Sequence, residues 1–166
     1  MTVAYVWAKP DKYMQLLQIR NRVHGLVDTN YYYRKQRPHI TLIPSFKIYG
    51  DSREAIVEKV ASSQIEGSKI HVNGLEVHED TDNPYAVFLS VDIEDSKKVK
   101  NLCDKLEPYS RVPINSGVDN HISLFKTRGC WDEVPQEVSD RLSNEIKFQN
   151  TFDDLTIENV KVEFKR

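Results

Sequence analysis

The stretch Pro38-His39-Ile40-Thr41-Leu42-Ile43 has a counterpart later in the chain, Asn120-His121-Ile122-Ser123-Leu124-Phe125. Both contain the series histidine, apolar, hydroxyl, apolar, and both are typical of β-strands. Because side chains alternate across a strand, each stretch places one imidazole and one hydroxyl on one face, with isoleucine and leucine on the other. Two such strands brought together would supply two histidines and two hydroxyls to a single site.

The offset between the two histidines aligns other segments as well. The matched pairs are residues 4–7 with 86–89, 52–63 with 134–145 and, after a small insertion, 70–77 with 155–162. Several matches in the same order favour an internal duplication, with copies at roughly 2–78 and 84–164. The segment between the copies is too short for an interdomain linker. We therefore predict one domain, residues 1–166, made of two pseudo-symmetric lobes.

Each copy is expected to fold as strand, helix, histidine strand, helix, strand. Apolar residues at helical spacing, such as Val99, Leu102, Cys103 and Leu106, support the helices. The expected strands are 2–8, 38–43, 70–77, 85–91, 120–125 and 155–162, and the expected helices begin at Pro10–Asp11, at Asp51 or Ser52, at Asp95 or Ser96, and at Asp132.

The composition indicates an ordinary soluble protein. The chain has 166 residues, of which 39% are hydrophobic and 29% charged, enough for one real core. The longest apolar run, residues 85–89, is too short to span a bilayer, and the first residues do not resemble a signal peptide. Cys103 and Cys130 lack metal-ligand spacing and favour a reducing compartment, so we expect a cytoplasmic protein with no membrane partner.

The charge pattern limits the class of partner. A formal net charge of −2 argues against a protein that grips duplex DNA, which usually carries a strong basic surplus. Positive charge is dense only at residues 34–37 and 126–128, each beside one of the histidine stretches. This distribution favours a small anionic substrate or a single RNA end, bound by what we expect to be a monomer.

The two histidine stretches are suited to phosphodiester chemistry. Cleavage needs a proton removed from the attacking oxygen and one delivered to the leaving oxygen, and imidazole, with an ordinary pKa of ~6.5, performs both near neutrality. Hydroxyls two residues away can donate hydrogen bonds to the non-bridging oxygens. This mechanism requires no metal or other cofactor. Lys126 and Arg128 are candidates for steering the phosphate.

The paired His-x-Thr/Ser pattern on duplicated strands resembles the 2H phosphoesterase superfamily, which includes so-called 2′–5′ RNA ligases and 2′,3′-cyclic nucleotide phosphodiesterases. The resemblance implies an α+β, bilobal fold whose antiparallel sheets line a central groove, with helices outside. It also implies that His39 and His121 are catalytic and that Thr41 and Ser123 bind phosphate. Ser123 departs from the commoner threonine but keeps the hydroxyl.

Other residues near the two stretches are candidates for substrate contact. Aromatic faces stack on nucleobases and arginine binds phosphate, which singles out Tyr33, Arg37 and Phe125. Trp131 fits core packing better than substrate contact. His24, His71 and His78 form no matching pair and have no zinc-ligand spacing, so structural roles are expected for them.

Two classes of function remain open from the sequence. The first is a metal-independent phosphodiesterase acting on 2′,3′-cyclic or 2′,5′-linked phosphates of nucleotides or RNA ends, for which RNA ligation through a 2′–5′ bond is the reverse reaction. The second is a binding module for RNA ends or nucleotides without turnover. The absence of a glycine-rich phosphate loop argues against an ATP-dependent ligase or kinase. The sequence does not assign the acid and base roles or the base preference.

Overall fold

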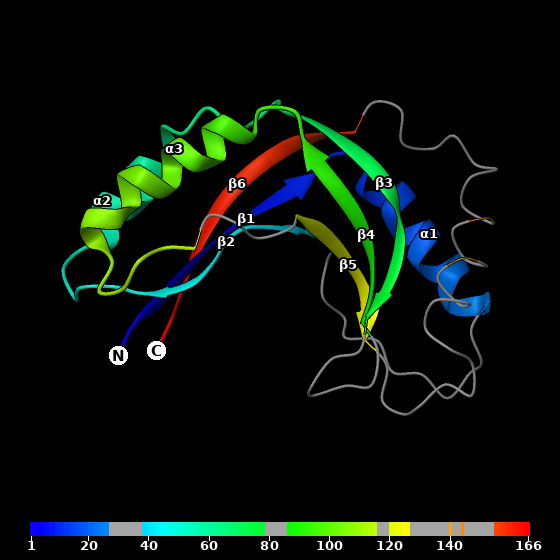
Figure 1. Cartoon of the computed structure of the whole chain (residues 1–166), viewed down its shortest axis with the longest axis horizontal. Coiled ribbons are helices and arrows are strands. Elements are labelled where there is room, and N and C mark those ends of the chain that lie inside the picture. Colours follow the sequence, from blue (N-terminus) through cyan, green and yellow to red (C-terminus); the bar gives the residue numbers. More distant parts are fainter. Residues whose placement is uncertain (27–37, 79–85, 116–119, 127–139, 141–143, 145–154) are drawn as a thin grey trace.

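The computed structural model describes residues 1–26, 38–78, 86–115, 120–126, 140, 144 and 155–166. Over these residues six strands close into an antiparallel barrel in the order β1-β2-β5-β4-β3-β6 (Figure 1). The strands are β1 (Val3–Pro10), β2 (Ile40–Lys47), β3 (Lys69–His78), β4 (Ala86–Ile93), β5 (His121–Lys126) and β6 (Leu155–Lys165). The helices are α1 (Tyr13–Leu26), α2 (Arg53–Ala61), α3 (Ser96–Leu106) and the short 3₁₀ helix η1 (Glu107–Tyr109).

The predicted arrangement of separate sheets lining a groove, with helices outside, is wrong. The strands form one closed ring because β2 pairs with β5 and β3 pairs with β6, so neither three-strand group keeps a free edge. Hydrophobic periodicity shows which face of a strand is buried, but it does not specify which other strand pairs with its edge. The duplication itself stays a prediction.

The elements themselves lie close to the predicted positions. In β1, Ala4, Val6 and Ala8 are fully buried while the residues between them are partly exposed, which is the two-residue alternation of a strand. The buried faces of the strands and helices share one apolar core. Figure 1 shows α2 and α3 together at one end of the molecule and α1 toward the other. The expected helix at 134–145 lies almost wholly outside the described residues.

The second strand departs from simple alternation at Leu42 and Ile43, which are both buried. Its pairing with β1 shifts twice, between Trp7↔Thr41 and Val6↔Ile43, and again between Val6↔Ile43 and Ala4↔Phe46, on either side of Pro44 in the second case. An extra residue on one strand is a β-bulge, and proline is tolerated there because it has no N–H to donate to the ladder. The first of these shifts falls within the histidine stretch, whose regular alternation holds from His39 to Leu42.

The helix starts differ in detail from the sequence expectation. Pro10 is the last residue of β1 rather than the first of a helix, and Lys12 turns the chain with a positive φ of 52° before α1 begins. Ser52 and Asp95 do occupy the N-cap positions of α2 and α3, but neither side chain makes a capping hydrogen bond.

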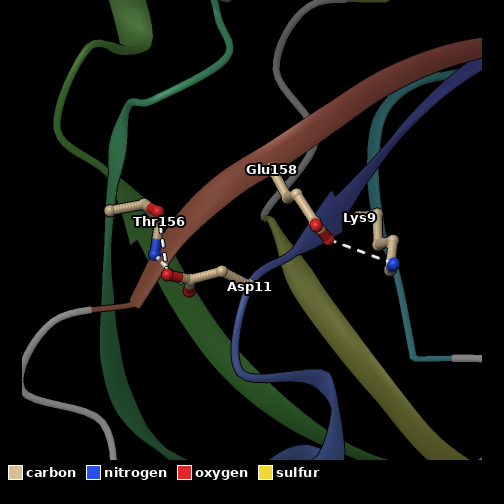
Figure 2. A network of polar contacts seen from close by, with 4 residues as sticks. All are labelled: Lys9, Asp11, Thr156 and Glu158. Atoms are coloured by element: carbon tan, nitrogen blue, oxygen red, sulfur yellow. Dashed lines mark hydrogen bonds and ion pairs between the residues drawn. The ribbon is translucent and has the colours of Figure 1, made fainter.

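Asp11 ties the end of β1 to the start of β6 (Figure 2). Its carboxylate accepts hydrogen bonds from the backbone N–H of Thr156 at 2.8 Å and from the Thr156 hydroxyl at 3.0 Å. The backbone N–H of Asp11 in turn donates to the Thr156 carbonyl at 2.8 Å. On the same strands Lys9 and Glu158 form an ion pair at 3.1 Å, with half of the Glu158 side chain exposed. The two contacts fix β1 to β6 where their register shifts, between Lys9 and Pro10.

We predict that Asp11→Ala lowers the free energy of unfolding by about 1.5–3 kcal/mol, because it leaves a partly buried N–H and hydroxyl without their charged acceptor. Glu158→Ala is the matched control, since an exposed ion pair contributes at most ~1 kcal/mol. Urea unfolding followed by circular dichroism measures both. Equal effects of the two substitutions would show that the Asp11 contacts do not hold this junction.

Candidate active site

The two histidine stretches lie on neighbouring strands. β2 and β5 run antiparallel and meet at one residue pair, Ile40↔Ile122. Both isoleucines are completely buried. Since neighbours along a strand point to opposite faces, the residues on either side of each isoleucine lie on the face away from the core.

The register then decides which functional groups face one another. Continued by one residue in each direction from the Ile40↔Ile122 pair, it places His39 opposite Ser123 and Thr41 opposite His121. Each imidazole therefore has a hydroxyl from the other strand as its direct neighbour. The two histidines are diagonal neighbours, a relation that separates backbones by about 7–8 Å in a regular ladder. All four residues are partly exposed, so solvent and ligands can reach them.

The adjoining strands place an aromatic side chain beside each histidine. The Trp7 ring on β1 meets the His39 ring at 5.7 Å between centroids, with the planes 68° apart. The Phe88 ring on β4 lies 4.8 Å from that of His121, tilted by 44°. Trp7 is paired with Thr41, and Phe88 with Ser123, so the aromatics belong to the same face as the four motif residues. Such contacts limit how far each imidazole can rotate.

A carboxylate on β6 binds two aromatic side chains of β1 next to the site. Glu163 accepts a hydrogen bond from the Trp7 indole N–H at 3.1 Å and another from the Tyr5 hydroxyl. Burial, together with the hydrogen bond to Glu163 and its negative charge, raises the pKa of Tyr5 from 10.0 to about 12. The Tyr5 hydroxyl therefore stays protonated, and able to donate, throughout the physiological range.

A pocket of about 160 Å³ lies beside His121. It is lined by Glu76, Phe88, Ser90, Val91, Asp92, Asn120 and His121. His39 is not part of this lining and lies one strand away, against Trp7. The lining is mostly polar, which suits a ligand with hydrogen-bonding groups more than a purely apolar one.

Charged side chains lie on both sides of the site. Lys161 lies opposite Trp7 on β6, with its Nζ 5.6 Å from the centre of the indole ring. Continuing the β1–β2 register places Lys9 opposite His39. On the other side, Glu76 and Asp92 contribute carboxylates to the pocket beside His121. On the His39 side the two lysines are accompanied by the carboxylates of Glu158 and Glu163, and on the His121 side the described pocket contains Glu76 and Asp92.

The other predicted site residues contribute less to this geometry. Tyr33, Arg37 and Arg128 lie outside the described residues, as do the basic cluster 34–37 and Trp131. Phe125 and Lys126 belong to β5, but only their backbone is described. His71 is exposed on β3 opposite Asp92. Cys103 is buried in α3, as its spacing predicted.

Sequence reasoning missed Trp7, Phe88 and Glu163. Trp7 did have a signal in the sequence, because it is a large aromatic residue at a non-core position of an alternating strand, where a polar residue is expected. Glu163 had no signal of its own, because its importance comes from the pairing of β1 with β6.

Within the described part of the chain, no group of three or more histidine, cysteine, aspartate or glutamate residues is arranged to hold a metal ion. None of the described helices is both long and apolar enough to cross a membrane.

The fold is similar to that of solved structures, although no family model and no curated protein sequence matches the chain. Usb1 from Kluyveromyces marxianus superposes with a TM-score of 0.55 at 16% sequence identity, over 97% of this chain and 93% of that one. A structure of the same protein with uridine monophosphate gives a TM-score of 0.54 at 15% identity, with the same coverage. These similarities show a shared fold.

The raised pKa of Tyr5 predicts how stability depends on alkaline pH. A pKa that is higher in the folded than in the unfolded chain gives stabilisation that is complete below about pH 10 and lost as the pH rises through about 12. The unfolding free energy should therefore fall more steeply with pH in the wild type than in Tyr5→Phe across this interval. Urea titrations at a series of alkaline pH values test this, and parallel curves would contradict it.

Proposed function

We propose that this protein is a metal-independent phosphodiesterase that hydrolyses 2′,3′-cyclic or 2′,5′-linked phosphates of nucleotides or RNA ends. His39 and His121 act as general acid and base, while Thr41 and Ser123 bind the non-bridging phosphate oxygens. The direction in which the substrate binds determines which histidine is the base.

One observation carries this proposal. The Ile40↔Ile122 pair places both histidines and both hydroxyls on a single solvent-accessible face, on neighbouring strands. A phosphate bound between the two imidazoles would have one imidazole on each side, as displacement at phosphorus requires. The two hydroxyls would face the non-bridging phosphate oxygens, on which negative charge accumulates.

Two further findings support the same class of chemistry. The His-x-Thr/Ser pairs resemble the motifs of the 2H phosphoesterases, and Usb1, whose fold is similar, is an enzyme of that family. The structure of Usb1 with uridine monophosphate supports a nucleotide as the ligand of a chain with a similar fold. A nucleotide substrate also fits a face with aromatic rings beside the phosphate-binding groups.

The first test is a panel of 2′,3′-cyclic nucleotides, 2′,5′-linked oligonucleotides and RNA ending in a cyclic phosphate, with the regiochemistry of each product determined. We expect hydrolysis of at least one class, a bell-shaped dependence of kcat/KM on pH, and no loss of rate in EDTA. A requirement for added metal would contradict the mechanism. Tight binding without product, even in a single turnover, would instead support a non-catalytic binding module, and net joining of RNA ends would support a ligase.

We predict that His39→Ala and His121→Ala each lower kcat by about 10²–10⁴-fold, because each removes one proton-transfer group. His71→Ala, an exposed histidine on β3, is the control and should retain the wild-type rate. Thermal unfolding shows whether each variant is folded. Near-wild-type turnover by either active-site variant on every good substrate would refute the assignment.

The two hydroxyls can be tested with variants of matched shape. Ser123→Ala and Thr41→Val remove a donor to the phosphate and should each reduce kcat by roughly 10–10³-fold. Ser123→Thr keeps the hydroxyl and adds a methyl group, so its rate should stay close to that of the wild type. Equal rates for Ser123→Ala and Ser123→Thr would show that the hydroxyl is not used.

A further inference from the structure

We infer that Glu163 is a positioning residue that sets the orientation of the His39 imidazole through the Trp7 indole. The inference rests on the proposed function, because it assigns a role within the same site. Glu163 belongs to neither histidine stretch and lies two strands away from His39, with β1 between them.

The first step is the contact of Glu163 with β1. In the antiparallel ladder Glu163 is paired with Tyr5, and Trp7 is the next residue along β1 on the same face. Oε2 accepts from the Tyr5 hydroxyl and Oε1 from the Trp7 indole N–H, so both carboxylate oxygens are engaged. A carboxylate held at both oxygens has little rotational freedom, and the indole it binds is restrained in turn.

The second step is the contact of Trp7 with His39. The nearly perpendicular rings have centroids 5.7 Å apart, an edge contact within the range of favourable aromatic pairs. Lys161 reaches over the indole from β6, at 5.6 Å from its centre. The indole is therefore held by a hydrogen bond at its nitrogen and by a cation at its face, and it presents a fixed surface to the imidazole.

This restraint matters for the reaction because proton transfer depends on the position of one ring nitrogen. Small displacements of a catalytic group reduce the rate strongly while leaving substrate binding nearly unchanged. Loss of the Glu163 contacts would free Trp7 and widen the rotation of His39. The effect should therefore appear in kcat rather than in KM.

Charge and geometry can be separated at this position. Along the same face of β6, Glu163 lies between Lys161 and Lys165, so removing its charge also changes the local electrostatic field. In Glu163→Gln the amide oxygen can accept from Trp7 and the amide N–H can donate to the Tyr5 oxygen, which keeps both contacts without the charge. Glu163→Ala removes both contacts and the charge together.

The experiment compares kcat and KM of Glu163→Ala and Glu163→Gln on the best substrate of the panel. We expect kcat of Glu163→Ala to fall about tenfold with KM nearly unchanged, and Glu163→Gln to recover most of the loss. Glu58→Ala, an exposed carboxylate on α2, is the control and should behave as the wild type. Wild-type kcat in Glu163→Ala would overturn the inference, as would an equal loss in Glu163→Gln, which would make charge the cause.

A readout that does not depend on turnover separates this inference from the proposed function. In NMR spectra, the Trp7 indole N–H and the His39 ring C–H signals should both shift in Glu163→Ala and remain near the wild-type positions in Glu163→Gln. Unchanged His39 signals would refute the coupling, whether or not the protein is active. If Glu163→Ala does not fold, Glu163→Asp, whose shorter side chain cannot keep both contacts, takes its place with the same expectations.

Discussion

The pairing of Ile40 with Ile122 is the constraint on which the site depends. Both side chains are fully buried, and burying an isoleucine contributes about 1.5–3 kcal/mol, so a one-residue slip that exposed either of them would be costly. The same slip would turn the imidazoles and hydroxyls into the core. The apolar contact that holds β2 against β5 therefore also fixes the face on which His39, Thr41, His121 and Ser123 lie.

The pair also closes the barrel. β2 and β5 are the facing edges of two better-paired groups, β6-β1-β2 and β5-β4-β3, and the other junction is the short pairing of β3 with β6. The two histidines and two hydroxyls lie on the non-core face, on either side of the junction between β2 and β5. The closed ring thus places the candidate catalytic groups where two strands from distant parts of the sequence come together.

Local patterns in the sequence predicted most of the elements and the strand face on which each histidine and hydroxyl lies, but not the arrangement of the strands. Alternation around His39 and His121 was sufficient to predict two strands with an imidazole and a hydroxyl on one face, because alternation is a property of each strand alone. The closed barrel was not predictable in this way, since it depends on which edges pair. Glu163 was missed for the same reason: its partners, Tyr5 and Trp7, are at the far end of the chain and become neighbours only through the β1–β6 pairing.

The two histidine stretches are nearly identical in sequence, yet the structure surrounds them differently. His39 has an indole edge beside it, held by a carboxylate, with lysines nearby. His121 has a phenyl ring and a polar pocket that contains Glu76 and Asp92. The strands that flank the motifs, rather than the motifs themselves, thus give the two histidines different neighbours.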